Sequence, residues 1–428
     1  MGNNFSKETL CIRGGFNPDS GDPVTQPLVQ STSYKFENCD QVANLFDLKE
    51  AGHIYTRISN PTVSNLEEKF VSLEGGVGAV CVSSGQSATL LAVLNICKAG
   101  EHIVVLSTVY GGTFNLLGVT LKNWGIETTF ISPDCSEGEL NESIKDNTKL
   151  ILGESLGNPS LRVLDMKKFS KVAKKREIPI VIDNTVATPY LFNPFEHGAN
   201  VVVHSTSKYS DGHSLALGGI IVDGGNFNWE NGKFPCLVEP DESYHGVKYV
   251  ETFGNAAYIT KLRVTLLRDL GCTISPFNAY LTNIGLETLH LRMERHSSNA
   301  LALAKYLERN DNVTWVDYPL LESHKDYEFA KEYLVKGASG LLSFGIKGGI
   351  EAAKKFIDNL KLAQLVVHLG DVRTTLLHPA STTHRQLSSE DLVKAGVTED
   401  LIRVSVGIEG IDDIINDFEQ AFNKLGDE

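Results

Sequence analysis

The chain has 428 residues, of which 42% are hydrophobic and 21% are charged. This composition excludes a disordered chain, because so much apolar surface buries itself. The 39 Lys and Arg residues against 53 Asp and Glu residues give a net charge of −14. An acidic chain without a basic block disfavours nucleic acid and anionic membranes as partners. No apolar run approaches the ~20 residues that a membrane-spanning helix needs.

The seven cysteines lie far apart and form no C-x-x-C pair. Such a pattern favours neither a disulfide framework nor a zinc site and indicates a reducing compartment. The first residues lack the apolar core of a signal peptide. His378 and His384 could share a site, but no further ligand follows at metal spacing. We therefore expect a cytoplasmic protein without a bound metal.

The predicted elements divide the chain into three parts. Residues 1–62 show no clear hydrophobic period and are predicted to form an N-terminal arm. Apolar, β-branched runs then alternate with helix-length stretches such as 86–99 and 164–177. The predicted strands are 79–83, 102–106, 127–131, 149–153, 178–183, 199–205 and 218–223. Continuous apolar strands separated by helices predict an α/β domain over 63–275, with a mostly parallel sheet covered by helices on both faces.

The sequence changes character near Pro276. Residues 276–309 have apolar positions at helical spacing and predict one long helix or two. Short strands are expected at 313–316, 340–346 and 401–406, followed by a final helix at 411–425. These elements predict a smaller α+β domain over 276–428. The Gly- and Asn-rich stretch 222–235 is predicted to be an inserted surface loop.

Three features indicate chemistry at one edge of the sheet. Asp183 ends a buried strand, where open α/β sheets bind ligands. Another apolar strand is followed by Ser205, Ser207 and Lys208, and a partly desolvated lysine is nucleophilic toward an aldehyde. The turn before residues 86–99 opens a helix at Gly85, where N–H groups can bind a phosphate. Each has an ordinary structural explanation, but together they supply what pyridoxal 5'-phosphate (PLP) requires.

Several motifs, ordered along nearly the whole chain, carry a resemblance to a known family. They are IYTRISNPT (54–62), SSGQSA (83–88), VYGGTF (109–114), VIDNTVATPYLFNP (181–194), VVHSTSKYSDGH (202–213), HPASTTH (378–384) and LIRVSVGIE (401–409). In these motifs the chain resembles the γ-family of fold-type I PLP enzymes of cysteine and methionine metabolism. The resemblance implies the aspartate-aminotransferase-like fold and a homo-oligomer, expected as a tetramer built from two dimers.

The resemblance also implies a role for each matching residue. Lys208 would form the Schiff base with PLP and move protons, Asp183 would pair with the ring nitrogen, and Tyr110 would stack on the ring and assist catalysis. Arg403 would bind the substrate carboxylate through a bidentate fork. The residues expected at the cofactor phosphate are Gly85, Gln86, Ser205 and Ser207, joined by Tyr55 and Arg57 from a neighbouring subunit. Tyr55 is also expected at the substrate.

The subgroup is indicated by residues 233–271, which look like the insertion typical of O-acetylhomoserine sulfhydrylases. This implies γ-replacement on O-acetyl-L-homoserine by sulfide or methanethiol, giving homocysteine or methionine and acetate. Gly112 stands where dedicated methionine γ-lyases carry Cys, and His368 stands where lyases have a Ser at the substrate carboxylate. A methionine γ-lyase, a cystathionine γ-synthase-type enzyme and a non-catalytic relative remain as alternatives.

Overall fold

The computed structural model describes residues 5–382, 385 and 397–426. Its larger sheet has seven strands in the order β1-β7-β6-β5-β4-β2-β3. Their bounds are β1 (Gly78–Val82), β2 (His102–Leu106), β3 (Glu127–Ile131), β4 (Thr148–Glu154), β5 (Ile180–Asp183), β6 (Val201–His204) and β7 (Gly219–Asp223). All seven predicted strands are present, and all but the half-buried edge strand β3 are mostly buried, as expected for a sheet covered on both faces.

The larger sheet is mostly parallel, as predicted, with one strand reversed. Strands β3, β2, β4, β5 and β6 pair in parallel, whereas β7 is antiparallel to both β6 and β1. Since β1 is reversed twice relative to β6, the two run in the same direction. The carboxyl ends of β1, β4, β5 and β6 therefore meet at one edge of the sheet, where ligands bind in folds of this class.

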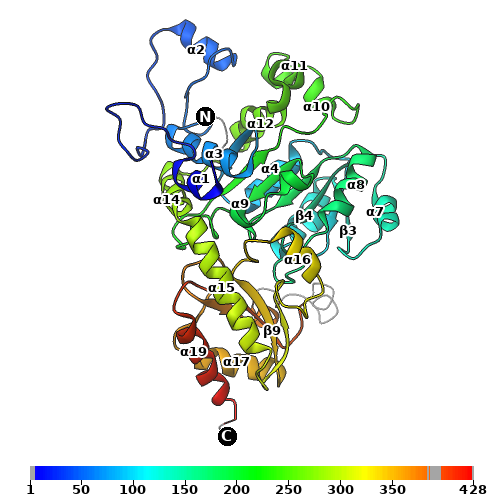
Figure 1. Ribbon diagram of the computed structural model, residues 1–428. Helices are drawn as coiled ribbons and strands as arrows, with labels where there is room; N and C mark the ends of the chain where they lie inside the picture. The colour runs from blue at the N-terminus through cyan, green and yellow to red at the C-terminus, as the bar shows by residue number, and fades with distance from the viewer. Residues whose placement is uncertain (1–4, 383–384, 386–396, 427–428) are drawn as a thin grey trace.

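Helices surround this sheet (Figure 1). They are α3 (Pro61–Glu74), α4 (Gly85–Leu94), α5 (Gly111–Asn115), α6 (Leu121–Asn123), α7 (Glu137–Ser143), α8 (Met166–Arg176) and α9 (Thr188–Leu191). The helix predicted at 86–99 ends earlier, at Leu94, whereas α8 matches its prediction closely. Among the described helices of the whole chain, none is long and apolar enough to cross a membrane.

The first 60 residues are not extended throughout. They contain α1 (Lys7–Arg13) and α2 (Cys39–Phe46), whose N-caps are the side chains of Ser6 and Asn38. Helix α1 packs against α3 of its own chain, and its Cys11 is fully buried. Helix α2, in contrast, projects from the body of the molecule (Figure 1). Both helices are too short to show a clear hydrophobic period, which is why the sequence did not predict them.

The region 222–271 is not a simple surface loop. It carries α10 (Pro235–Val238), α11 (Tyr249–Phe253), α12 (Ala257–Leu262) and α13 (Arg268–Leu270). Within the stretch expected to be a surface loop, Trp229 and Phe234 are buried. The Trp229 ring stacks on Tyr258 with 5.3 Å between ring centroids. Large aromatic rings bury enough apolar surface to anchor a Gly- and Asn-rich segment whose composition alone indicates exposure.

A second, smaller sheet follows the first along the chain. Its five strands have the order β10-β11-β12-β9-β8. The elements are α14 (Pro276–Glu287), α15 (Leu289–Leu307), β8 (Val313–Asp317), α16 (Tyr327–Tyr333), β9 (Leu341–Ile346), α17 (Gly349–Asn359), β10 (Gln364–Leu365), β11 (Thr375–Leu377), β12 (Leu401–Ser405) and α19 (Ile411–Asn423). The stretch 276–309 thus forms two helices, separated at Thr288. Helices α17 and α19 lie at the C-terminal end of the molecule, and α14 lies beside α1 and α3 (Figure 1).

Candidate active site

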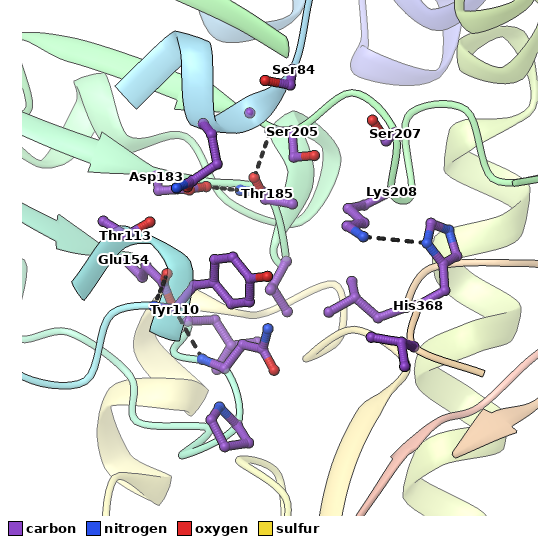
Figure 2. A pocket seen from close by; sticks show the side chains of 18 of the residues that line it. Ser84, Tyr110, Thr113, Glu154, Asp183, Thr185, Ser205, Ser207, Lys208 and His368 are labelled. Atoms are coloured by element: carbon purple, nitrogen blue, oxygen red, sulfur yellow. Dashed lines mark hydrogen bonds between the residues drawn. The ribbon is translucent and has the colours of Figure 1, made fainter. Parts of the chain in front are cut away.

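A cavity of about 280 Å³ opens at the carboxyl edge of the larger sheet. One wall comes from α4, α5 and the ends of β4, β5 and β6, and the other from β12 and the segment between β10 and β11. The polar lining residues are Ser84, Gln86, Tyr110, Thr113, Glu154, Asn158, Asp183, Thr185, Ser205, Ser207, Lys208, His368 and Arg403. The predicted residues Lys208, Asp183 and Tyr110 are therefore brought together (Figure 2). Arg403 lines the same cavity.

The N-terminus of α4 forms one end of the cavity. Ser84 caps the helix, its side chain accepting the N–H of Ser87 at 3.1 Å. The N–H groups of Gly85 and Gln86 are the first of the helix and have no carbonyl partner within it. A Cβ on Gly85 would lie 2.6 Å from the Cβ of Ser205, so only glycine allows this close approach. These N–H groups and the nearby serine hydroxyl suit an anionic group such as a phosphate.

The amine of Lys208 lies inside the cavity, 3.2 Å from Nδ1 of His368 (Figure 2). Burial, followed by the charge of Arg403, lowers the pKa of Lys208 to about 8. Burial and the adjacent Lys208 likewise lower the pKa of His368 to about 4. The imidazole is therefore neutral near pH 7 and accepts a hydrogen bond from the amine. A lysine with a lowered pKa is a competent nucleophile and proton acceptor.

Asp183 ends β5 on the same side of the cavity. Its Oδ1 accepts the backbone N–H of Thr185 at 2.9 Å. Burial raises the pKa of Asp183 above its usual range. A buried carboxylate of this kind is stabilised by a protonated partner, which a ring N–H of a ligand in the cavity would supply.

Tyr110 precedes α5, and its ring turns back over the following residues into the cavity (Figure 2). A Cβ on Gly112 would lie 2.5 Å from Cε1 of Tyr110. Any side chain at position 112 would therefore displace the ring from its present orientation. The absence of a cysteine at this position, noted from the sequence, thus has a direct structural consequence at Tyr110.

Arg403 lies on β12 and is nearly buried. Its Nη1 donates to Oδ1 of Asn158 at 3.1 Å, and its Nη2 donates to the backbone oxygen of His368 at 2.9 Å. Burial lowers its pKa to about 10, so the guanidinium keeps its charge at neutral pH. Its Nε is buried and has no partner among the described residues. A fixed cation in a cavity of this size is suited to a carboxylate ligand.

Sequence reasoning assigned no role to five polar residues of the cavity, namely Ser84, Thr113, Glu154, Asn158 and Thr185. Glu154 is the last residue of β4, and Thr185 follows β5 by two residues. The rule that identified Asp183, a polar residue at the carboxyl end of an apolar strand, could have found Glu154 as well. Asn158 has a weaker signal, because it lies in an irregular loop beyond the strand.

Two predicted residues do not reach the cavity of their own chain. Tyr55 and Arg57 are exposed, and Nη1 of Arg57 donates to the backbone oxygen of Arg268. Ser207 lines the cavity, but its hydroxyl donates to the backbone oxygen of Gly218 at 3.2 Å and accepts the N–H of Gly218 at 2.9 Å.

His384, considered above as a metal ligand together with His378, lies outside the described residues. Among the described residues, no cluster of His, Cys, Asp and Glu side chains is arranged to hold a metal.

The geometry defines a class of site. An amine with a lowered pKa, a carboxylate at the end of the neighbouring strand, a helix N-terminus with serines and an arginine form the donor set of a PLP-dependent enzyme. The residues present therefore fit this cofactor, and the close approach that Gly85 permits provides the cradle for its phosphate.

Comparison with known proteins agrees with a PLP-dependent site. Residues 8–423 match the family described as Cys/Met metabolism PLP-dependent enzyme, and the chain belongs to this family. It is 49% identical to the O-acetyl-L-homoserine sulfhydrylase of Leptospira meyeri, over 99% of this chain and 98% of the relative. It is 46% identical to the homocysteine synthase of Schizosaccharomyces pombe, over 97% of each chain.

A solved structure from Campylobacter jejuni, described as an O-acetylhomoserine (thiol)-lyase, superposes with a TM-score of 0.95 at 42% identity. The match covers 98% of this chain and 100% of the other, which carries N'-pyridoxyl-lysine-5'-monophosphate. The predicted fold class and family are thereby confirmed.

Proposed function

We propose that this chain is a PLP-dependent transferase that replaces the acetate of O-acetyl-L-homoserine with sulfide, giving homocysteine. The observation that carries the proposal is the convergence of Lys208, Asp183 and Arg403 on one cavity. Relatives with sulfhydrylase and homocysteine synthase activity, matched over nearly the full chain, support this substrate and product. Methanethiol in place of sulfide would give methionine.

Lys208 would hold the cofactor covalently, and Asp183 would pair with the nitrogen of its ring. Gly85, Gln86 and Ser205 would bind the phosphate through the N–H groups of α4 and a hydroxyl. Ser207 would join them only if its hydroxyl left Gly218. When bound, PLP supplies an electron sink that stabilises negative charge on the substrate carbons next to the reacting nitrogen.

The protein residues would then bind the substrate and move its protons. Arg403 would hold the α-carboxylate, which places the Cα hydrogen within reach of the Lys208 amine. Lys208 Nζ would remove that proton and then one from Cβ, so that the electron pair left on Cβ expels acetate from Cγ. After sulfur has bonded at Cγ, Lys208 would return protons to Cβ and Cα. A lysine whose pKa lies at about 8 accepts and donates protons readily near neutral pH. Tyr110 would pack over the cofactor ring.

The choice of nucleophile would depend on the apolar side of the cavity. Leu156, Val186, Leu217, Val367 and Leu369 line it together with the ring of Tyr110. Hydrogen sulfide and methanethiol are small enough to fit such a surface, whereas free cysteine is bulkier and its charged groups would lose their hydration there.

Tyr55 and Arg57 would complete the site from a second copy of the chain. Both are exposed on their own chain and do not line its cavity, which supports a place in a neighbouring one. The enzyme would then act as a homo-oligomer, expected as a tetramer of two dimers, in the cytoplasm.

A substrate panel tests the proposal. Acetyl-, succinyl- and phosphohomoserine are each combined with sulfide, methanethiol and cysteine, and the products are identified by mass spectrometry. The proposal predicts homocysteine and acetate as the fastest reaction. A strong preference for cysteine would make the protein a cystathionine synthase, and release of ammonia and a 2-oxoacid without replacement would make it a lyase.

A further inference from the structure

Glu154 is a buried carboxyl group at the cavity to which neither the sequence nor the proposed function assigns a role. It is the last residue of β4, is 8% exposed, and faces the cavity beside Tyr110 (Figure 2). Its strand neighbour in register is Asp183. Burying a carboxyl group costs free energy unless the group forms hydrogen bonds, so the contacts of Glu154 indicate what its burial achieves.

The two oxygens of Glu154 join two separate loops. Oε1 accepts the backbone N–H of Tyr110 at 2.7 Å, and Oε2 accepts the backbone N–H of Asn158 at 3.2 Å. Tyr110 and Asn158 are 48 positions apart in the chain. One side chain on a strand end therefore sets the distance between the loop that carries the Tyr110 ring and the loop that carries Asn158.

The second of these loops continues to the opposite wall of the cavity. Oδ1 of Asn158 accepts a hydrogen bond from Nη1 of Arg403 at 3.1 Å. Arg403 in turn donates to the backbone oxygen of His368 at 2.9 Å. A continuous path of hydrogen bonds thus runs from the Tyr110 backbone through Glu154 and Asn158 to the guanidinium.

We propose that Glu154 is a positioning residue that orients Tyr110 through Oε1 and Arg403 through Oε2 and Asn158. The roles of Tyr110 and Arg403 in this inference rest on the proposed function. The hydrogen-bonded path from Tyr110 through Glu154 and Asn158 to Arg403, called the tie below, is a property of the folded chain. Glu154 touches neither substrate nor cofactor in this account. It acts through the two loops it holds.

The two acceptor oxygens of Glu154 decide which variants are informative. Burial, followed by the neighbouring charge of Asp183, raises the pKa of this carboxyl group well above the usual range. Glutamine has nearly the same shape as glutamate but keeps only one acceptor oxygen. That oxygen will stay with the shorter bond, to the N–H of Tyr110, and the amide nitrogen cannot accept from Asn158. Leucine removes both acceptors.

Amide hydrogen exchange on the full chain tests the tie, both as purified and after cofactor removal. Glu154→Leu is expected to speed exchange at Tyr110 and Asn158 by at least about tenfold, and Glu154→Gln at Asn158 only. In turnover assays, Glu154→Gln should raise the KM for O-acetylhomoserine about tenfold with kcat nearly unchanged, because only the Arg403 side is released. Glu154→Leu should lower kcat as well.

Asp417→Asn is the matched control. Asp417 is also a buried carboxyl group, and it accepts the backbone N–H groups of residues 361–363 in the smaller domain. This variant should speed exchange at 361–363 and leave Tyr110, Asn158 and KM unchanged. Unaltered exchange in Glu154→Leu, or equal changes in Asp417→Asn, would overturn the inference. If the exchange pattern appears but no replacement product forms, the tie stands and the proposed function falls.

Discussion

The two walls of the cavity are built by different rules. On the wall from the larger sheet, Asp183 ends β5 and Lys208 follows β6, so parallel strands deliver both to the same edge. On the opposite wall, Arg403 lies in the middle of β12, and His368 lies between two very short strands, β10 and β11. The first wall follows from sheet topology, whereas the second depends on how the smaller domain packs against the first.

The two walls differ in the ligand that each is proposed to bind. In the proposed function, the wall from the larger sheet binds the cofactor through an amine, an acid and a helix N-terminus. The other wall carries a guanidinium suited to the substrate carboxylate. Changes on the first wall should therefore impair cofactor chemistry, and changes on the second should mainly impair substrate binding.

The largest effect is expected for Lys208→Ala. No other described lysine lines the cavity, so covalent attachment and proton transfer are both lost. The variant should show no turnover above background and no absorbance near ~420 nm, where the wild type with cofactor absorbs. Residual turnover within about tenfold of wild type would show that Lys208 is not the catalytic amine.

Asp183→Asn should weaken cofactor affinity by about 10- to 100-fold, because a charge-assisted hydrogen bond is replaced by a neutral one. Titration of the cofactor-free protein, followed by fluorescence, measures this affinity. The shape of the site is retained, since asparagine can still accept the N–H of Thr185. A cofactor affinity equal to that of the wild type would show that Asp183 does not bind the cofactor.

Arg403→Lys tests the substrate wall. Lysine keeps the charge but not the planar fork, so the KM for O-acetylhomoserine should rise about tenfold while cofactor affinity stays unchanged. Steady-state kinetics and the same fluorescence titration report the two quantities. A loss of cofactor affinity in this variant would break the distinction between the walls.

The smallest expected effect is a shift in the pKa of Lys208. This pKa depends on both walls, because the charge of Arg403 on the opposite wall contributes to it. In the cofactor-free protein, the pKa of about 8 makes the Lys208 amine half neutral at pH 8, so it reacts with acetic anhydride at lower pH than an exposed lysine of ordinary pKa 10.5. The neutral fraction grows as pH rises through this value. Arg403→Leu should move the midpoint upward, because a neighbouring positive charge that disfavours the ammonium is removed. Peptide mass spectrometry across pH measures it, and a midpoint near 10.5 in the wild type would contradict it.

Sequence reasoning was most successful where one strand explains one residue. The runs 178–183 and 199–205 are mostly apolar, and their ends placed Asp183 and the residues after β6 correctly at the sheet edge. Strands β10 and β11, of two and three residues, are too short to show a period. The contacts of Glu154 and Asn158 join residues far apart in the chain, and the burial of Trp229 depends on Tyr258 in a later helix. Such pairings have no local signal.

The most direct measurement is to identify the lysine that carries the cofactor. The protein with cofactor is reduced with borohydride, digested, and searched by mass spectrometry for a phosphopyridoxyl group. Lys69 is the internal comparison, since burial also lowers its pKa to about 8 while its side chain lies outside the cavity. If cavity geometry decides, the label is found on Lys208 alone. A label on Lys69, or spread over several lysines, would contradict the placement of the active site.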